Sequence, residues 1–233
     1  MQLFLVNKHM KKITLVLISL FLTTNLWANS PPLGGWYMYF GNTMFKDSKW
    51  KANYDVQYRN HELASDLNQL VVRTSAQYQV MNNLNVAVGY AFVHSEHINT
   101  PDLPYYENRI FQDVSTQQNY GASVLRHRFR LEQRFIENQD YKSRIRYQLG
   151  VEIPVYKNEE KNQSIYTTAY NEVFMNLDKA SRSKNAFDRN RLYLGAGYKF
   201  NKDVSIQIGW MNQMLQKQSN QQLMISLHHS LEW

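Results

Sequence analysis

The sequence predicts an all-β protein, a single antiparallel up-and-down transmembrane β-barrel of the outer-membrane type with 10 or 12 strands. Three observations carry this prediction. Apolar and polar residues alternate along nearly the whole chain after residue 35. Several alternating stretches are about ten residues or longer, the length that a tilted strand needs to cross a membrane. Aromatic residues stand near the ends of the apolar faces, as in the girdles of membrane barrels.

The composition excludes a membrane protein built of helices. The chain has 233 residues, of which 43% are apolar and 19% are charged, and its mean hydropathy is -0.56. A membrane-spanning helix needs about 20 consecutive, mostly apolar residues, and the one apolar run lies at the N-terminus. The chain contains no cysteine, which excludes disulfide frameworks, thiolate metal sites and a lipoprotein anchor.

Residues 1–28 are expected to be a secretory signal peptide. Its three zones follow in order: the basic residues Lys8, Lys11 and Lys12, the apolar stretch 13–22, and the small residue Ala28 at the cleavage point. The apolar stretch is shorter than a membrane span, so cleavage is expected rather than anchoring. Met10 is an alternative start, since the residues before it add nothing that a signal needs. Residues 29–233 then form one barrel domain.

Eleven alternating segments follow, separated by turn residues. The segments are 36–45, 50–58, 70–80, 84–92, 107–117, 124–135, 141–155, 166–175, 188–200, 204–215 and 221–233. The turns contain Asn, Asp, Gly or Pro at 82–83, 99–104, 119–121, 138–140, 158–162, 201–202 and 219–220. Bacterial single-chain barrels usually have an even number of strands, so 10 or 12 is expected. With ten, the segment 36–45 would lie inside or across the lumen.

Alternation of apolar and polar residues alone does not show which face of the strands points into the barrel. A soluble periplasmic barrel that binds an apolar ligand would turn its apolar face inward, whereas an outer-membrane barrel turns it toward lipid. The strand lengths and the aromatic ends, such as Tyr78, Tyr198 and Trp233, favour lipid. The last segment carries Leu231 and Trp233 on its apolar face, an ending that resembles the signal read by the barrel-assembly machinery. The expected location is therefore the outer membrane of a bacterial cell, in contact with its lipid.

Several stretches resemble a known family. They are Trp50 with Tyr58-Arg59-Asn60, Gly89-Tyr90-Ala91, the arginine-rich run 126–134, Ala169-Tyr170-Asn171-Glu172, Asn190-Arg191-Leu192-Tyr193, and Gly197-Tyr198. Together they resemble the domain-of-unknown-function 2490 family (DUF2490) of exported Gram-negative proteins over nearly all of the mature chain. The resemblance implies an outer-membrane-type barrel in Gram-negative bacteria, and it supplies no activity and no catalytic residues.

The charges gather on the polar faces of the strands. The net charge is +7, and it falls to +4 without the three signal lysines. Fourteen basic and seven acidic residues lie on the polar faces, so the lumen is expected to be strongly positive. The main basic ladder is Arg126, Arg128, Arg130, Arg134, Arg144, Arg146, Arg189 and Arg191, and its acidic partners are Glu107, Glu132 and Glu172. Keeping like faces together sets Glu132 opposite Arg144 or Arg146.

Two interpretations of this ladder stay open. A barrel of eight strands has an interior that side chains fill, and only about sixteen give an open channel. The lumen is therefore either a static network that braces the wall, or a narrow anion-favouring pore or anionic-ligand site. Arginine suits both, because its guanidinium makes two parallel contacts with a carboxylate or phosphate. A nucleic-acid partner is not expected, since the arginines and the aromatic faces lie on opposite sides of the same strands.

Catalysis is not expected, and the enzymatic alternative is a lipid hydrolase. His228 and Ser230 share a face of the last segment with Glu232, a set that an outer-membrane lipid hydrolase could use. Their parity points them into the lumen at the periplasmic end, away from lipid, so ordinary lumen residues are favoured.

No metal or cofactor is expected either. His94 and Glu96 share a face but His97 does not, so ligation of a metal by all three would need a bulge. The sequence also lacks phosphate-loop, dinucleotide and zinc-protease motifs.

Overall fold

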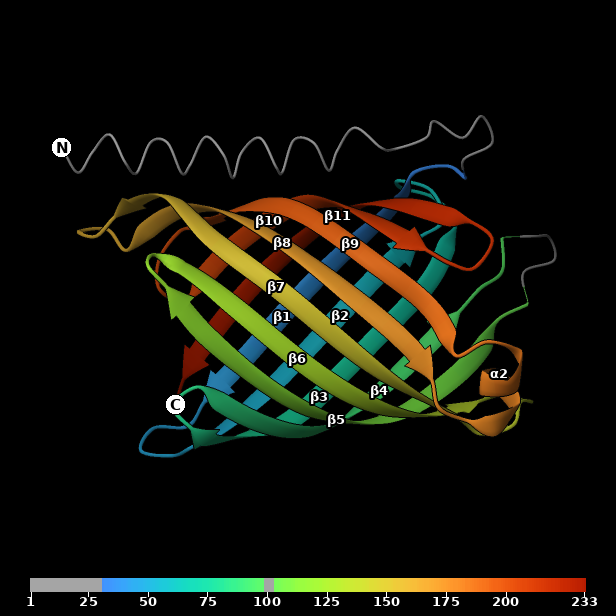
Figure 1. The fold of residues 1–233 in the computed structure, drawn as a ribbon. Helices are drawn as coiled ribbons and strands as arrows, with labels where there is room; N and C mark the ends of the chain where they lie inside the picture. The colour runs from blue at the N-terminus through green and yellow to red at the C-terminus, as the bar shows by residue number, and fades with distance from the viewer. Residues whose placement is uncertain (1–30, 99–102) are drawn as a thin grey trace. The chain divides into compact units, whose positions relative to one another are not determined.

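The computed structural model describes residues 31–98 and 103–233, so the expected signal peptide lies outside the described residues (Figure 1). The described chain forms one closed barrel of eleven strands. The strands are β1 (Gly34–Met44), β2 (Trp50–Asn60), β3 (Leu67–Met81), β4 (Leu84–Ser95), β5 (Tyr105–Tyr120), β6 (Ser123–Ile136), β7 (Lys142–Asn158), β8 (Gln163–Asn176), β9 (Phe187–Lys199), β10 (Val204–Met214) and β11 (Ser219–Glu232). A short helix, α2 (Lys179–Lys184), lies between β8 and β9.

The strand number corrects the expected 10 or 12. Sequence neighbours pair antiparallel all the way round, but the barrel closes by a parallel pairing of β1 with β11. Gly34 stands opposite Gln222, and Met44 opposite Glu232. A parallel closing pair requires an odd number of strands, so the usual even count is the wrong criterion here. The segment 36–45 is consequently a wall strand and does not cross the lumen.

The connections alternate between two ends of the barrel (Figure 1). The turn end holds the connections 45–49, 82–83, 121–122, 159–162 and 200–203 together with the C-terminus, and the loop end holds 61–66, 96–104, 137–141, 177–186 and 215–218. Gly121 and Asn162 have φ values of 59° and 52° at the turn end, a left-handed conformation that glycine and asparagine tolerate. The turn positions expected from the sequence are confirmed at both residues.

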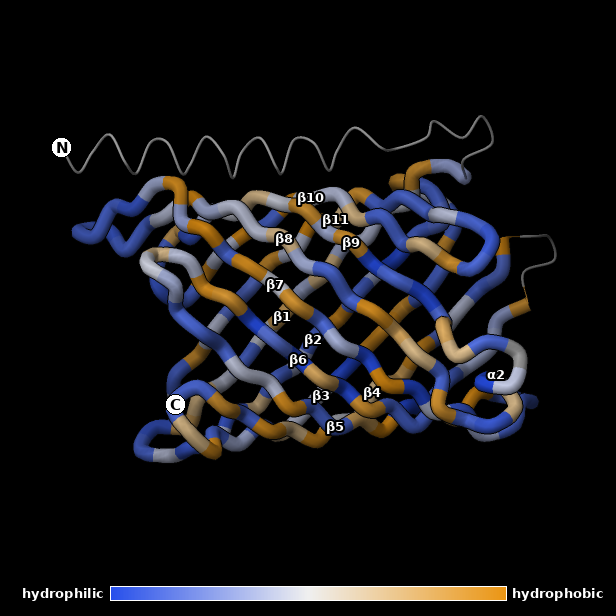
Figure 2. Tube along the Cα trace, viewed as in Figure 1, coloured by the Kyte–Doolittle hydropathy of each residue, from blue (hydrophilic) through white to orange (hydrophobic). Residues whose placement is uncertain are grey.

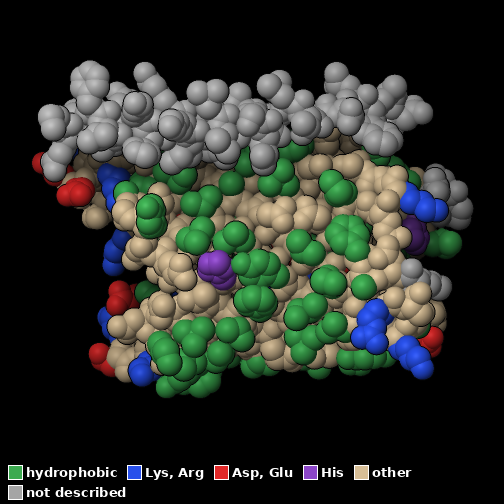
Figure 3. All heavy atoms as spheres, in the orientation of Figure 1, with side chains coloured by type: hydrophobic (Ala, Val, Ile, Leu, Met, Phe, Trp, Pro, Cys, Tyr) green, Lys and Arg blue, Asp and Glu red, His purple; other side chains and the backbone are tan. Residues whose placement is uncertain are grey.

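Apolar side chains cover the outside of the barrel. On β4, Val88 and Tyr90 are 54% and 45% exposed, while their neighbour Ala91 is 1% exposed. On β10, Ile206 and Ile208 are 41% and 53% exposed, while Met211 is fully buried. Figure 2 shows the resulting alternation along the strands, and Figure 3 shows hydrophobic side chains across the middle of one face with charged ones at its two ends. The apolar face therefore points outward and the polar face lines the lumen.

The expected aromatic residues meet at the turn end. The rings of Trp50 and Tyr78 lie 4.9 Å apart, those of Tyr198 and Phe200 also 4.9 Å, and Trp233 lies 6.3 Å from Phe45. These six residues are called the turn-end aromatics below. Within residues 31–98 and 103–233, no helix has the length and apolar character needed to cross a membrane.

Candidate functional site

The centre of the lumen is an arginine–carboxylate network built on β5 to β9. The ladder predicted on β6 and β7 is confirmed in register, with Glu132 opposite Arg144 and Arg134 opposite Lys142. The alternation of each strand aims its charged residues inward, and neighbouring strands bring opposite charges within reach. The network is therefore a direct product of the sequence pattern and the strand register.

Glu132 lies at the middle of this network and is 1% exposed. Its Oε2 accepts hydrogen bonds from Nε and Nη2 of Arg144 at 2.9 and 2.5 Å, and its Oε1 accepts one from Nη1 of Arg146 at 2.5 Å. Arg144 and Arg146 are themselves 4% and 6% exposed. A buried carboxylate with two guanidinium partners is compensated in charge and in hydrogen bonds, which burial of an ion demands.

The pairs continue on both sides of Glu132 into one chain of contacts. Glu172 on β8 joins Arg146 at 2.7 Å to Arg128 at 2.9 Å. Asp188 on β9 joins Arg144 at 2.8 Å to Arg189 at 3.1 Å. Four arginines and three carboxylates thus alternate without a break across β6 to β9. Alternation of β9 alone would turn Asp188 outward, but a register shift between Phe174 and Met175 of β8 lies beside it.

Three more of the predicted residues, Glu107, Arg130 and Arg134, form two separate groups. Glu107 accepts from Arg109 at 2.7 Å and from Arg134 at 2.5 Å. Arg130 donates through Nε and Nη2 to Asp113, both at 2.6 Å. Asp113 is not among the acidic partners that the sequence predicted for the ladder, Glu107, Glu132 and Glu172.

Arg126 lies apart from this network, toward the turn end. It binds Glu152 at 3.0 Å and its side chain is 49% exposed, while Lys199 binds the same carboxylate at 2.8 Å. The ladder is therefore not one uniform site, because its turn-end member is solvated and its centre is buried.

Two buried arginines have no carboxylate within 4.0 Å among the described residues, and both contact Trp36. Arg59 lies over the Trp36 ring at 4.0 Å from its centroid, and Arg191 at 5.0 Å. The guanidinium carbon of Arg191 also lies 4.8 Å from the centroid of the Phe174 ring, and that of Arg146 lies 4.4 Å from the same centroid. Cations and aromatic rings are therefore neighbours across the lumen, and these contacts are stabilised by the negative charge on the ring faces.

Trp36 also belongs to an apolar cluster on the opposite wall. The cluster is formed by the buried residues Trp36, Tyr193, Met211 and Met224, with Met38 and Tyr170 packed against it. Sequence reasoning missed Trp36 and Arg59 as site residues, because the place of the first segment in the wall was open. The signal that could have found them is the alternation itself, which puts Trp36, Met38 and Phe40 on one face of β1 and Arg59 on the polar face of β2.

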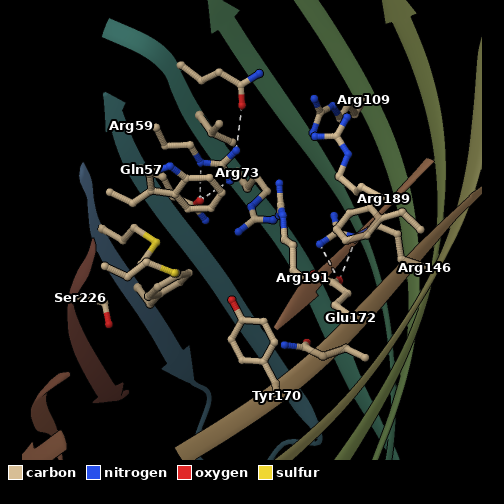
Figure 4. Close-up of a pocket in the computed structure, with 18 of the residues that line it drawn as sticks. Gln57, Arg59, Arg73, Arg109, Arg146, Tyr170, Glu172, Arg189, Arg191 and Ser226 are labelled. Carbon is tan, nitrogen blue, oxygen red and sulfur yellow. Dashed lines mark hydrogen bonds and ion pairs between the residues drawn. The ribbon is translucent and has the colours of Figure 1, made fainter. Parts of the chain in front are cut away.

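A cavity with a volume of about 270 Å³ lies between the network and the apolar cluster. Nine arginines and two glutamates line it, together with residues of the apolar cluster. In Figure 4, Arg59, Arg73, Arg109, Arg189 and Arg191 point into this cavity from four strands. A second cavity of about 230 Å³ adjoins Arg128 and Arg130, whose Nε and Nη1 atoms respectively are buried without a hydrogen-bond partner. The lumen is thus filled in part and keeps positively charged space.

The candidate hydrolase residues do not contact one another. Nε2 of His228 lies 2.9 Å from Oγ of Ser226, and its ring stacks on Phe40 at 5.0 Å. Ser230 accepts a hydrogen bond from Asn42 at 2.9 Å, and Glu232 lies 3.9 Å from Lys202 with a side chain that is 53% exposed. The expected inward direction of His228 is confirmed, whereas the three residues have different partners.

The histidines near the loop end are also separated. His94 contacts Glu96 at 2.7 Å, and the His97 ring lies 5.3 Å from that of Tyr105. In the part of the chain that the structure describes, no group of three His, Asp or Glu side chains has the arrangement of a metal site.

Comparison with known proteins supplies a family but no activity. A protein from Methylorubrum extorquens described as uncharacterized is 27% identical over 211 residues, which cover 88% of this chain and 90% of that protein. No solved structure matches the chain. The family model described as a protein of unknown function (DUF2490) matches residues 33–224, which include the arginine ladder and most of the barrel wall. The chain therefore belongs to the DUF2490 family.

Proposed function

We propose that this protein is an integral β-barrel of the bacterial outer membrane, without catalytic activity, whose lumen is closed by arginine–carboxylate pairs and keeps a positively charged cavity. The observation that carries the proposal is the reversed polarity of the barrel. Its outer surface is apolar and its interior is ionised. A soluble barrel that binds an apolar ligand has the opposite arrangement.

The outer surface supports a lipid environment. Soluble monomers rarely expose a contiguous apolar patch larger than a few hundred Å², whereas large apolar side chains are exposed on every strand of this barrel except β9. The turn-end aromatics form a girdle at one edge of this surface, where amphipathic rings favour the lipid–water boundary.

The interior supports a closed lumen more than an open pore. Glu107, Glu132, Phe174, Tyr193 and Met211 are each at most 1% exposed although they point into the barrel. The Trp36 ring of β1 contacts Arg59 of β2 and also Arg191 of β9, so side chains from different parts of the wall fill the lumen together. Eleven strands lie nearer to the eight that side chains can fill than to the roughly sixteen of an open channel.

The C-terminus supports recognition by the barrel-assembly machinery. The side chains of Leu231 and Trp233 are 44% and 81% exposed on the outer surface at the turn end. They are therefore accessible to a partner, while the backbone of Trp233 is held by Met44 at 2.9 Å.

Two measurements test the proposal. Membrane fractions washed with urea are expected to retain the protein, and its gel mobility is expected to change on heating, as for a folded membrane barrel. Recovery in the soluble periplasmic fraction would refute the membrane location. In planar bilayers the purified protein is expected to give no stable conductance. A steady anion-selective current that Arg128→Glu with Arg130→Glu reverses would show an open pore and refute the closed lumen.

The absence of catalysis is tested separately. Cells that produce Ser230→Ala or Ser226→Ala are expected to turn over their outer-membrane lipids like wild-type cells. Loss of a lipid-hydrolysing activity in either variant would favour the hydrolase instead.

A further inference from the structure

We propose that the cavity beside Trp36 binds one small organic carboxylate, held by Arg59 and Arg191. The inference rests on the closed, positively charged lumen of the proposed function and names the ligand class that the lumen takes. It starts from the two buried arginines that the network leaves without a carboxylate.

Arg59 and Arg191 are 7% and 9% exposed. The other three buried arginines, Arg130, Arg144 and Arg146, each have a carboxylate within 2.6 Å. An unpaired buried ion costs several kcal/mol in desolvation, and a guanidinium does not lose its proton to avoid that cost. An anion in the adjoining cavity would supply the missing partner.

The two guanidinium groups are close enough for one ligand. Each lies over the Trp36 ring, at 4.0 and 5.0 Å from the same centroid, so their central carbons lie within 9.0 Å of each other. Both residues line the 270 Å³ cavity. One ligand in this cavity can therefore reach both guanidinium groups.

The hydrogen bonds of the two arginines leave donors for such an anion. Arg191 donates from Nε to Gln213 at 2.9 Å, and its two Nη atoms have no hydrogen-bond partner among the described residues. Those two nitrogens form one edge of the guanidinium fork, which matches the two oxygens of a carboxylate. Arg59 is held in place by Gln57 and Gln69, at 2.5 and 2.8 Å, so both cations are preorganised.

The rest of the cavity favours an apolar body on the ligand. Met38 and Phe40 of β1 and Met224 of β11 line it beside Trp36. A cavity of about 150 Å³ holds benzene, so the 270 Å³ here has room for a benzoate-sized carboxylate. The lining reaches Tyr105, the first residue of β5, which indicates entry from the loop end.

Calorimetric titration of the folded protein in detergent tests this site, with benzoate as the probe. Benzoate is expected to bind at one site per chain, and benzyl alcohol, which has no charge, is not. Arg191→Gln is expected to weaken benzoate binding about tenfold or more, the effect of losing a charged hydrogen-bond pair. The matched control is Arg126→Gln, the same change in a lumen arginine outside the cavity, and it is expected to leave the affinity unchanged.

A second measurement covers the case in which Arg191→Gln does not fold. Benzoate is expected to change the tryptophan emission of the wild-type chain, and Trp36→Phe is expected to remove that change while the gel-mobility shift shows an intact barrel. Equal weakening by Arg191→Gln and Arg126→Gln would overturn the site, since only the overall charge would then matter. Inorganic phosphate that binds as tightly as benzoate would overturn the organic carboxylate, and no benzoate binding would overturn the inference outright. These outcomes are separate from fractionation, which tests the membrane location.

Discussion

The carboxylate of Glu132 offers the sharpest test of the lumen network. The change Glu132→Gln keeps the size of the side chain and removes its charge, and it leaves the guanidinium groups of Arg144 and Arg146 short of a buried partner. Removing one partner of a buried ion pair costs about 3–5 kcal/mol of unfolding free energy. Glu132 is 1% exposed and holds three hydrogen bonds of 2.5–2.9 Å, so the loss should lie within this range.

Glu152→Gln is the matched control for this experiment. Glu152 also bridges two cations, but the side chains of those partners, Arg126 and Lys199, are 49% and 41% exposed. Pairs with such exposed groups contribute about 0–1 kcal/mol each because water screens them. The control variant is therefore expected to lose about 1 kcal/mol.

Reversible unfolding in urea, in detergent micelles or lipid vesicles, measures both losses through tryptophan emission and gel mobility. Extrapolation to zero urea gives the free energies, provided that the slope of each transition matches that of the wild type. An unfolding free energy of Glu132→Gln within 1 kcal/mol of the wild type would refute the buried network. Equal losses in the two variants would show that the centre of the lumen is as well solvated as its turn end.

Three further predictions concern closure, packing and assembly. In this cysteine-free chain, Thr43→Cys with Leu231→Cys should form a disulfide, because these residues are paired across β1 and β11. Thr43→Cys with Leu223→Cys should not, since Leu223 pairs with Gly35. A disulfide detected on non-reducing gels in the second variant and not in the first would exclude the parallel closure. Gly209→Ala should destabilise the barrel by about 1–3 kcal/mol, because an added Cβ would clash with the Tyr193 side chain. Gly150→Ala should have little effect, since the nearest atom to its Cβ would lie 3.5 Å away. Equal unfolding midpoints of the two variants would contradict this packing. Trp233→Ala should lower the amount of folded barrel in cells but barely change the stability of refolded protein, since this side chain is 81% exposed; a large loss of refolded stability would assign Trp233 a structural role instead.

Much of the wall could be predicted because alternation is a local property. The alternation of apolar and polar neighbours indicates which face of a strand is apolar, and the turn residues Gly121 and Asn162 mark where the chain reverses direction. The register of β6 against β7 follows to within one residue pair from the short connection between them, so Glu132 could be set opposite Arg144 or Arg146, and the structure pairs it with Arg144. Residues that are neighbours on adjacent strands are thus within reach of sequence reasoning.

The closure and the partners beyond neighbouring strands could not be predicted. Whether β1 meets β11 in parallel depends on which strand edges remain when all hairpins have formed, and no local pattern contains that information. The pair of Arg128 with Glu172 crosses β7 and joins residues 44 positions apart, and Asp188 enters the network beside a register shift. These contacts depend on strand tilt and irregularity, which act on the whole barrel.

The sequence by itself determined that the chain is all-β, that its strands have one apolar and one charged face, and that arginine dominates the charged face. Only the tertiary structure decided that eleven strands close the barrel, which arginines have carboxylate partners, and that Arg59 and Arg191 share Trp36. The physical reason is that the direction of a side chain follows from its own strand, whereas its partner across the lumen depends on the curvature and closure of all eleven strands.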